Sequence, residues 1–263
     1  MACNTCLACR SGRYNLCSEM RFAATPPCDG TLAEYYRLPE ENCFLLPPHV
    51  SLREGALVEP LSVAVHCCRL AGDFQGRSAI IFGAGPIGLL CSAVVKTFGA
   101  SSVVVVDSVE SRLIFASSFG ATTTFQMLPS STDTNAEALL ASAKLAGGAD
   151  IVIDATGAQP CIECGVHCLK RGGTFIQAGL GAPQISFPIA QICDKEATIR
   201  GSFRYGPGDY QLAIELLNSG RVGVKEMITH EYPFSEVEKA FINVSERQGI
   251  KTVIYGPGVD SLV

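Results

Sequence analysis

Short continuous apolar runs alternate with segments of helical character between residues 78 and 178. The runs predict strands over residues 78–82, 102–106, 122–125, 151–154 and 174–178. The segments between them predict a turn at 171–173 and helices over residues 89–98, 112–119, 136–146 and 162–169. Strands that alternate with helices are typical of the α/β class, here a doubly wound parallel sheet.

The flanking segments predict smaller elements. Residues 31–38 alternate like a strand, and Ser51 and Glu54 have the spacing of a helix-capping box, which Ser235 and Glu238 repeat. The remaining pattern predicts a short element over 44–48, helices over 210–219 and 235–241, an extended stretch over 227–234 and a closing strand over 251–255.

The first strand of the sheet runs into a G-x-G-x-x-G pattern formed by Gly83, Gly85, Pro86, Ile87 and Gly88. The next strand ends in an acid, Asp107, which lies 19 residues after Gly88. Glycines at these positions let the backbone turn tightly and approach a pyrophosphate at the helix N-terminus. We expect Asp107 to accept hydrogen bonds from ribose hydroxyls and to repel a 2′-phosphate, which favours NAD over NADP. An ordinary glycine-rich turn would not predict this acid.

Ligands of a doubly wound sheet bind at the carboxyl ends of its strands. This rule places Asp107, Thr156, residues 178–180 and residues 203–205 on the cofactor side. Arg112, five residues past Asp107, either reaches the adenine or ribose or is a solvated helix arginine, and both interpretations stay open.

The chain contains 13 cysteines. Four of them lie at the start of the chain: Cys3, Cys6, Cys9 and Cys17. Their spacing, C-x2-C-x2-C-x7-C, suits a closed tetrahedral zinc site. The alternative is that they are scattered free thiols. Most others lie in apolar segments, where thiols behave as small hydrophobes, as for Cys67, Cys68, Cys91, Cys164 and Cys168. An odd number of cysteines and no secretory signal predict a reducing compartment, the cytoplasm.

Composition narrows the class of partner. The 263 residues have a net charge of −5 and no long basic run, which argues against nucleic acid and anionic membranes. Residues 78–95 are uncharged, but glycines and a proline divide them into a strand and a helix rather than a membrane span.

Glu59 lies in the middle of the apolar stretch 55–66. A buried carboxylate is costly without a partner, which a metal, a metal-bound water or a substrate hydroxyl would supply. The alternative is a helix-start carboxylate before Pro60 that nearby N–H groups satisfy. We interpret His66 as a structural histidine.

Further motifs are spread along the chain at residues 12–17 (GRYNLC), 22–27 (FAATPP), 30–32 with 35–36 (GTL and YY), 59–66 (EPLSVAVH), 201–205 (GSFRY) and 229–230 (TH). Together they resemble the polyol dehydrogenase branch of the zinc-dependent medium-chain dehydrogenases, over essentially the whole chain. The resemblance implies a Rossmann NAD-binding domain beside part of a GroES-like, β-rich catalytic domain with a four-cysteine zinc lobe. It assigns residues 1–66 to the catalytic domain, 67–205 to the NAD-binding domain and 206–263 to a segment that completes both.

The resemblance also implies roles for single residues. The four cysteines at the start match structural zinc ligands, and Glu59, Arg204 and Tyr205 match positions near the substrate and the catalytic zinc. Cofactor-contacting positions are matched by Ile87, Asp107, Arg112, Ala178, Gly179, Leu180, Ser202, Phe203 and Arg204. The implied reaction is zinc-assisted hydride transfer to NAD from a polyol of the xylitol or sorbitol type, giving a ketose, in a homodimer or homotetramer.

The sequence departs from the family in one respect. In these enzymes a preceding lobe of about one small domain supplies catalytic zinc ligands that include a Gly-His-Glu motif. The only His-Glu pair here is at 230–231, in a late strand, and we interpret it as structural. We therefore expect an N-terminally truncated chain with little or no activity and with exposed apolar surface that favours aggregation. The alternatives are a NAD- and zinc-binding fragment or subunit, and a zinc-independent reductase of the same superfamily.

Overall fold

The computed structural model describes residues 1–259. The chain divides into two compact units. The sheet unit is Val63–Phe203, and the cysteine unit combines Met1–Ser62 with Arg204–Val263. Helix α3 (Val58–Ala71) begins in the cysteine unit and continues into the sheet unit. The three-part domain division implied by the resemblance remains a prediction.

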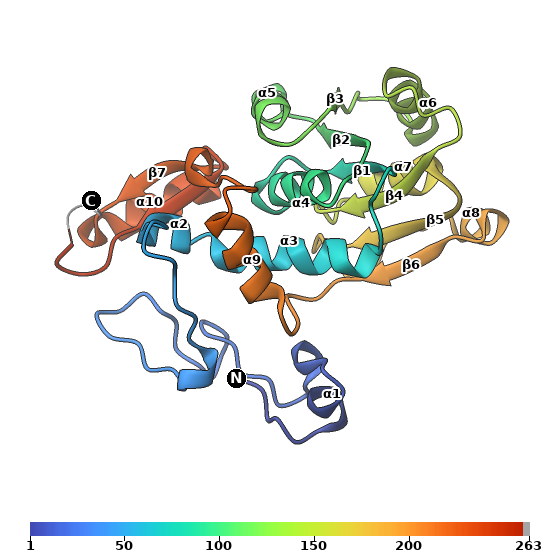
Figure 1. The fold of residues 1–263 in the computed structure, drawn as a ribbon. Helices are drawn as coiled ribbons and strands as arrows, with labels where there is room; N and C mark the ends of the chain where they lie inside the picture. Colours follow the sequence, from blue (N-terminus) through green and yellow to red (C-terminus); the bar gives the residue numbers. More distant parts are fainter. Residues whose placement is uncertain (260–263) are drawn as a thin grey trace. The chain divides into compact units, whose positions relative to one another are not determined.

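The sheet unit contains six parallel strands in the order β3-β2-β1-β4-β5-β6 (Figure 1). Their bounds are β1 Ser78–Phe82, β2 Ser102–Asp107, β3 Thr123–Gln126, β4 Ala149–Asp154, β5 Leu169–Gln177 and β6 Thr198–Gly201. The sheet grows outward in both directions from β1 and β4, so the switch in strand order lies between these two strands. Dinucleotides bind at this switch point in doubly wound sheets.

Two groups of helices cover this sheet. They are α4 (Pro86–Thr97), α5 (Glu110–Phe119), α6 (Thr132–Ser142), α7 (Gln159–Cys168) and α8 (Ile189–Lys195). Helix α4 packs on β1 and β2 and contacts α5, whereas α7 packs on β1, β4 and β5 and contacts α6 and α8. Every residue of β1 is buried, because helices cover both faces of a parallel sheet.

The cysteine unit has shorter elements. They are α1 (Leu7–Arg10), η1 (Tyr14–Leu16), η2 (Glu40–Asn42), α2 (Leu52–Gly55), α9 (Asp209–Asn218), η3 (Lys225–Met227), β7 (Ile228–Tyr232), η4 (Phe234–Glu236), α10 (Val237–Ser245) and β8 (Lys251–Ile254). Strands β7 and β8 pair in parallel, and α10, which connects them, packs on both.

The doubly wound sheet, the closing strand and the Ser51–Glu54 capping box are confirmed. The strand predicted over 31–38 is wrong: these residues are exposed, and neither sheet of the described chain offers them a neighbouring strand. Residues 44–48 also lack a regular element. The second capping box is wrong as well, because α10 begins after Glu236 with no side-chain cap.

Further differences lie in and around β5 and β6. The predicted turn at 171–173 is part of β5, where Gly172 has a φ of +72° and the pairing with β4 is irregular. Helix α8 and the exposed strand β6 had no predicted counterpart, because neither has a pronounced apolar pattern. Among residues 1–259, none of the helices has the length and apolar character needed to cross a membrane.

Candidate cofactor and metal sites

The glycine-rich turn joins β1 to α4 in the sheet unit. Gly83 has a φ of +97°, and its N–H donates to the carbonyl of Val106, 2.7 Å away. A Cβ on Gly88 would lie 1.8 Å from the Gly83 oxygen, so only glycine lets the helix approach the strand this closely. Pro86, which needs no hydrogen-bond partner for its nitrogen, is the first residue of α4. The backbone therefore has the form of a pyrophosphate-binding turn, with Ile87 in the first turn of the helix.

Asp107 ends β2 beside this turn. One carboxylate oxygen accepts the N–H of Ala84 at 2.7 Å, and the other accepts the N–H of Val109 at 2.9 Å. The carboxylate is thus fixed next to the glycine turn, within the arrangement that suits ribose hydroxyls. Arg112 lies in the first turn of α5 and is partly buried.

The loops after β4 and β5 lie against each other. Gly157 has a φ of +70°, and a Cβ on Gly179 would come within 2.2 Å of the Gly157 nitrogen. Leu180 is 91% exposed beside a cavity of about 390 Å³ that these loops line together with the residues Ile162, Phe175, Gln177, Pro183, Ile185, Phe187 and Ile199. The predicted cofactor positions 178–180 therefore lie at the carboxyl ends of the strands, next to the switch point.

Ser202 and Phe203 follow β6. The Ser202 N–H donates to the carbonyl of Gln177 at 2.8 Å, and its hydroxyl lies 3.2 Å from the Cys67 sulfur. Phe203 is 45% exposed. A hydrogen bond with Cys91, together with burial, raises the pKa of the Cys67 thiol, so it stays protonated at neutral pH.

The four cysteines at the start converge in the cysteine unit. Their sulfurs all lie within 4.8 Å of one another, with 3.9 Å between Cys3 and Cys9 and 3.5 Å between Cys6 and Cys9. Four sulfurs bound tetrahedrally at about 2.3 Å from zinc would be about 3.8 Å apart. Cys3 and Cys17 are further fixed by backbone N–H donors, from Cys6 to Cys3 at 3.3 Å and from Cys3 to Cys17 at 3.5 Å. The quartet therefore fits a structural zinc ion.

Two thiols of the quartet differ in pKa. A hydrogen bond from the Thr5 hydroxyl, with backbone N–H groups, lowers the pKa of Cys3 to about 6. Desolvation, with hydrogen bonds to neighbouring thiols, raises the pKa of Cys9 to about 12. Zinc binds thiolates, so its binding would release the protons that thiols such as Cys9 retain.

Glu59 lies in the first turn of α3, within the cysteine unit. Its side chain is exposed, so the prediction of a buried carboxylate is wrong; the residue lies on a face of α3 that the described chain leaves open. Desolvation by surrounding protein still raises the pKa of Glu59, while the positive charges of Lys251 and Arg204 act in the opposite direction. Glu59 is thus an exposed carboxylate whose charge interacts favourably with those of Lys251 and Arg204.

Arg204 and Tyr205 lie in the segment that leads to α9. Arg204 has a φ of +53°, and its guanidinium carbon lies 3.5 Å from the centre of the Phe22 ring. The Tyr205 ring meets Tyr210 edge-on at 4.8 Å, and Phe44 stacks on Tyr210 at 5.1 Å. Phe22 and Tyr210 were not among the predicted site residues, since an isolated aromatic residue has no pattern that separates it from core.

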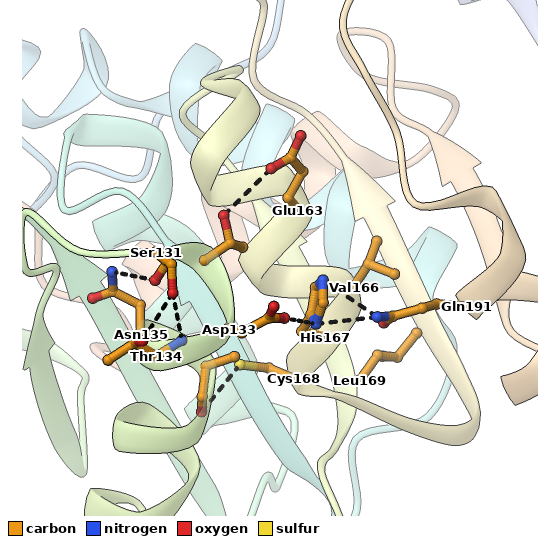
Figure 2. Close-up of polar contacts among 12 residues, drawn as sticks. Ser131, Asp133, Thr134, Asn135, Glu163, Val166, His167, Cys168, Leu169 and Gln191 are labelled. Carbon is orange, nitrogen blue, oxygen red and sulfur yellow. Dashed lines mark hydrogen bonds and ion pairs between the residues drawn. The ribbon is translucent and has the colours of Figure 1, made fainter.

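The main polar cluster away from these sites joins α6, α7 and α8 (Figure 2). His167 Nδ1 lies 2.8 Å from an Asp133 oxygen and 3.1 Å from the Gln191 amide nitrogen. The Lys195 ammonium donates to three backbone carbonyls where α7 ends, at Val166, His167 and Leu169. The cluster lies where β5 begins, at the end of the strand opposite to the cofactor loops, and it caps a helix rather than forming a catalytic arrangement.

Comparison with known proteins identifies the family. Residues 86–219 match the zinc-binding dehydrogenase domain, and residues 1–48 match the alcohol dehydrogenase GroES-like domain. D-xylulose reductase A of Aspergillus niger is 51% identical over 259 residues, which are 98% of this chain and 72% of the relative. The chain belongs to the zinc-binding dehydrogenase family.

Solved structures of the family agree with this assignment. An Escherichia coli oxidoreductase of unknown specificity has 34% identity and a TM-score of 0.88, over 97% of this chain and 73% of that one. Escherichia coli L-idonate 5-dehydrogenase has 27% identity and a TM-score of 0.87, over the same shares. As a member of the family, the chain is an oxidoreductase whose cofactors are zinc and a nicotinamide dinucleotide.

Proposed function

We propose that this chain is an NAD-dependent polyol dehydrogenase that converts xylitol to D-xylulose and is similar to D-xylulose reductase. The observation that supports this most directly is the 51% identity to D-xylulose reductase A over 98% of the chain. Asp107 beside the glycine turn favours NAD over NADP, because its charge repels a 2′-phosphate. NAD, when bound, accepts the hydride of the alcohol carbon.

The residues of the chain have distinct roles in this proposal. The glycine turn binds the pyrophosphate, Asp107 and Arg112 bind the adenosine half, and residues 178–180 with Ser202 and Phe203 contact the nicotinamide half. In the cysteine unit, Arg204 and Tyr205 orient substrate hydroxyls, and Glu59 accepts a hydrogen bond from one of them. The four-cysteine zinc stabilises the lobe and takes no part in the reaction.

A catalytic zinc needs about three protein ligands. Glu59 is one candidate, but within residues 1–259 the cysteine quartet is the only place where three or more histidine, cysteine or acidic ligand atoms come together. We therefore propose that this chain has little activity by itself. A second candidate, an NAD- and zinc-binding fragment or subunit, is favoured by the same observation. The proposal also includes a cytoplasmic location and assembly into a homodimer or homotetramer.

The test combines three measurements on the purified chain: zinc per chain, NADH binding, and NADH formation with xylitol. We expect one zinc, NADH binding and very slow turnover. Rapid turnover, or a second tightly bound zinc, would contradict the proposed weak activity. Turnover that survives removal of all metal would point to a zinc-independent reductase, and failure to bind NADH would overturn the proposed function itself. Glu59→Gln should abolish any residual turnover while leaving NADH binding unchanged.

A further inference from the structure

Asp154, the last residue of β4, is a fully buried carboxylate. One oxygen accepts the hydroxyl of Thr156 at 2.6 Å and its N–H at 3.3 Å. The other accepts the N–H of Gly157 and the amide of Gln177, both at 2.7 Å. All of these donors are neutral, so oriented dipoles stabilise the carboxylate of Asp154. Hydrogen bonds to a charged acceptor of this kind are strong.

These partners come from two loops. Thr156 and Gly157 belong to the loop after β4, and Gln177 ends β5. Gln177 also donates to the carbonyl of Gly179 at 2.8 Å, and the backbone oxygen of Asp154 accepts the N–H groups of Ala178 at 2.9 Å and of Gly179 at 2.8 Å. Asp154 thereby fixes the loop that begins at Ala178 to the loop that follows its own strand.

The same residue lies at the switch point of the sheet. Asp154 pairs with Phe82, the last residue of β1, and with Gln177 in β5. The methyl group of Thr156, whose hydroxyl Asp154 holds, is 2.9 Å from where a Cβ on Gly83 would lie. Asp154 therefore links the loop after β4, whose Thr156 methyl lies against the glycine turn, to the loop that carries residues 178–180.

We propose that Asp154 and Gln177 are positioning residues that determine the affinity of the chain for the nicotinamide half of NAD without contacting it. The inference rests on the proposed NAD-binding function. The adenosine half binds at Asp107 and the glycine turn, neither of which is hydrogen-bonded to Gln177. Disturbing the Asp154–Gln177 hydrogen bond should therefore weaken binding of NADH and spare ligands that lack nicotinamide.

The test compares NADH with ADP-ribose in the full chain. Gln177→Leu removes the donor to both Asp154 and Gly179, and we expect NADH affinity to fall about tenfold, as for the loss of a hydrogen bond to a charged group. ADP-ribose affinity should stay within about twofold. The matched control is Gln191→Leu in α8, whose amide contacts His167 instead, and it should leave both affinities unchanged.

The outcomes separate the inference from the function on which it rests. Equal loss of both ligands in Gln177→Leu, or no loss of either, would overturn the positioning role. If the wild-type chain binds neither ligand, the proposed function fails first. Should Gln177→Leu not fold, Thr156→Val and Thr156→Ser replace it: the valine variant loses the hydroxyl bonded to Asp154, and the serine variant keeps it. Selective loss of NADH in the valine variant, with rescue in the serine variant, is then the expected result, and any other pattern refutes the role.

Discussion

The sheet unit and residues 1–48 of the cysteine unit are stabilised in different ways. In the first, apolar strands are covered by helices, and side chains such as Ile80 and Leu89 are completely buried. In the second, Leu7, Tyr35 and Leu45 are 82%, 85% and 95% exposed, and residues 1–17 converge on four thiols instead of an apolar core. A segment with little buried apolar surface can still have a fixed structure when a metal supplies the missing free energy.

The largest effect should follow removal of the metal. Structural zinc contributes about 10 kcal/mol or more to small zinc-binding domains, so a chelator or Cys9→Ser should unfold the lobe around residues 1–17. Proteolysis should then cut this lobe while the sheet unit resists. Acid should have the same effect, because the thiolates become protonated as the pH falls. Cys43→Ser, at an exposed cysteine outside the quartet, should retain one zinc. If the lobe stays uncut after verified loss of the metal, zinc is not what stabilises residues 1–17.

A matched pair of leucine variants tests the apolar core. Leu89→Ala removes a fully buried side chain in α4 and should lower the free energy of unfolding by about 2–5 kcal/mol. Leu45→Ala removes a side chain that is 95% exposed and should change the free energy of unfolding by no more than about 0.5 kcal/mol. Urea titrations of both variants measure the difference. Similar costs at the two positions would show that Leu45 is covered in solution.

An acid-dependent contribution is expected from Asp150 at the start of β4. Desolvation raises the pKa of Asp150, but hydrogen bonds from Lys170 and Ser78 outweigh it and bring the pKa to about 2. Since an unfolded aspartate titrates near 3.9, the contribution is present above about pH 4 and is lost as the pH falls through about 2. Asp150→Asn should therefore lower the free energy of unfolding by about 2 kcal/mol at neutral pH.

The pH series provides the check on this prediction. The difference between wild type and Asp150→Asn in urea titrations should shrink steadily between pH 4 and pH 2. Lys170→Met should reduce stability with the same pH dependence, because it removes one of the donors to Asp150. A difference that is constant with pH would rule out ionisation as its cause.

The smallest effect should come from the pair in Figure 2. Asp133→Asn weakens the contact with His167, but the Asp133 side chain is 73% exposed, and exposed ion pairs contribute about 0–1 kcal/mol. We expect a change below about 0.5 kcal/mol by thermal unfolding. A larger loss would indicate that this cluster, and not only the apolar core, stabilises the α6–α7 contact.

The sequence predicted the sheet unit well because its signals are local. An apolar run such as 78–82 forms a strand whose neighbours lie in the same chain, and the cysteine spacing predicted a cluster that the structure brings together. The segment 31–38 has an equally clear alternation but no pairing strand among the described residues. Alternation of apolar and polar residues predicts only which side chains would share a face of a strand. Whether the strand forms depends on a pairing strand from a distant part of the chain.

The site was predictable to a different extent. Asp107 follows a strand and a glycine motif, so its position could be inferred from spacing. Asp154 also ends a strand, but its importance depends on Gln177 and on backbone N–H groups whose direction no sequence pattern specifies. Glu59 was expected to be buried because its neighbours in sequence are apolar, whereas exposure depends on which side of α3 faces solvent.

The close contact of the loops at Gly157, Gly179 and Gly181 has a consequence for mutational scans. A Cβ on any of the three would lie within 2.5 Å of backbone atoms of the opposing loop. A scan of all substitutions should therefore find these codons among the most intolerant in the gene. Such intolerance is easily mistaken for a catalytic role, yet here it would record only the absence of room for a single carbon atom.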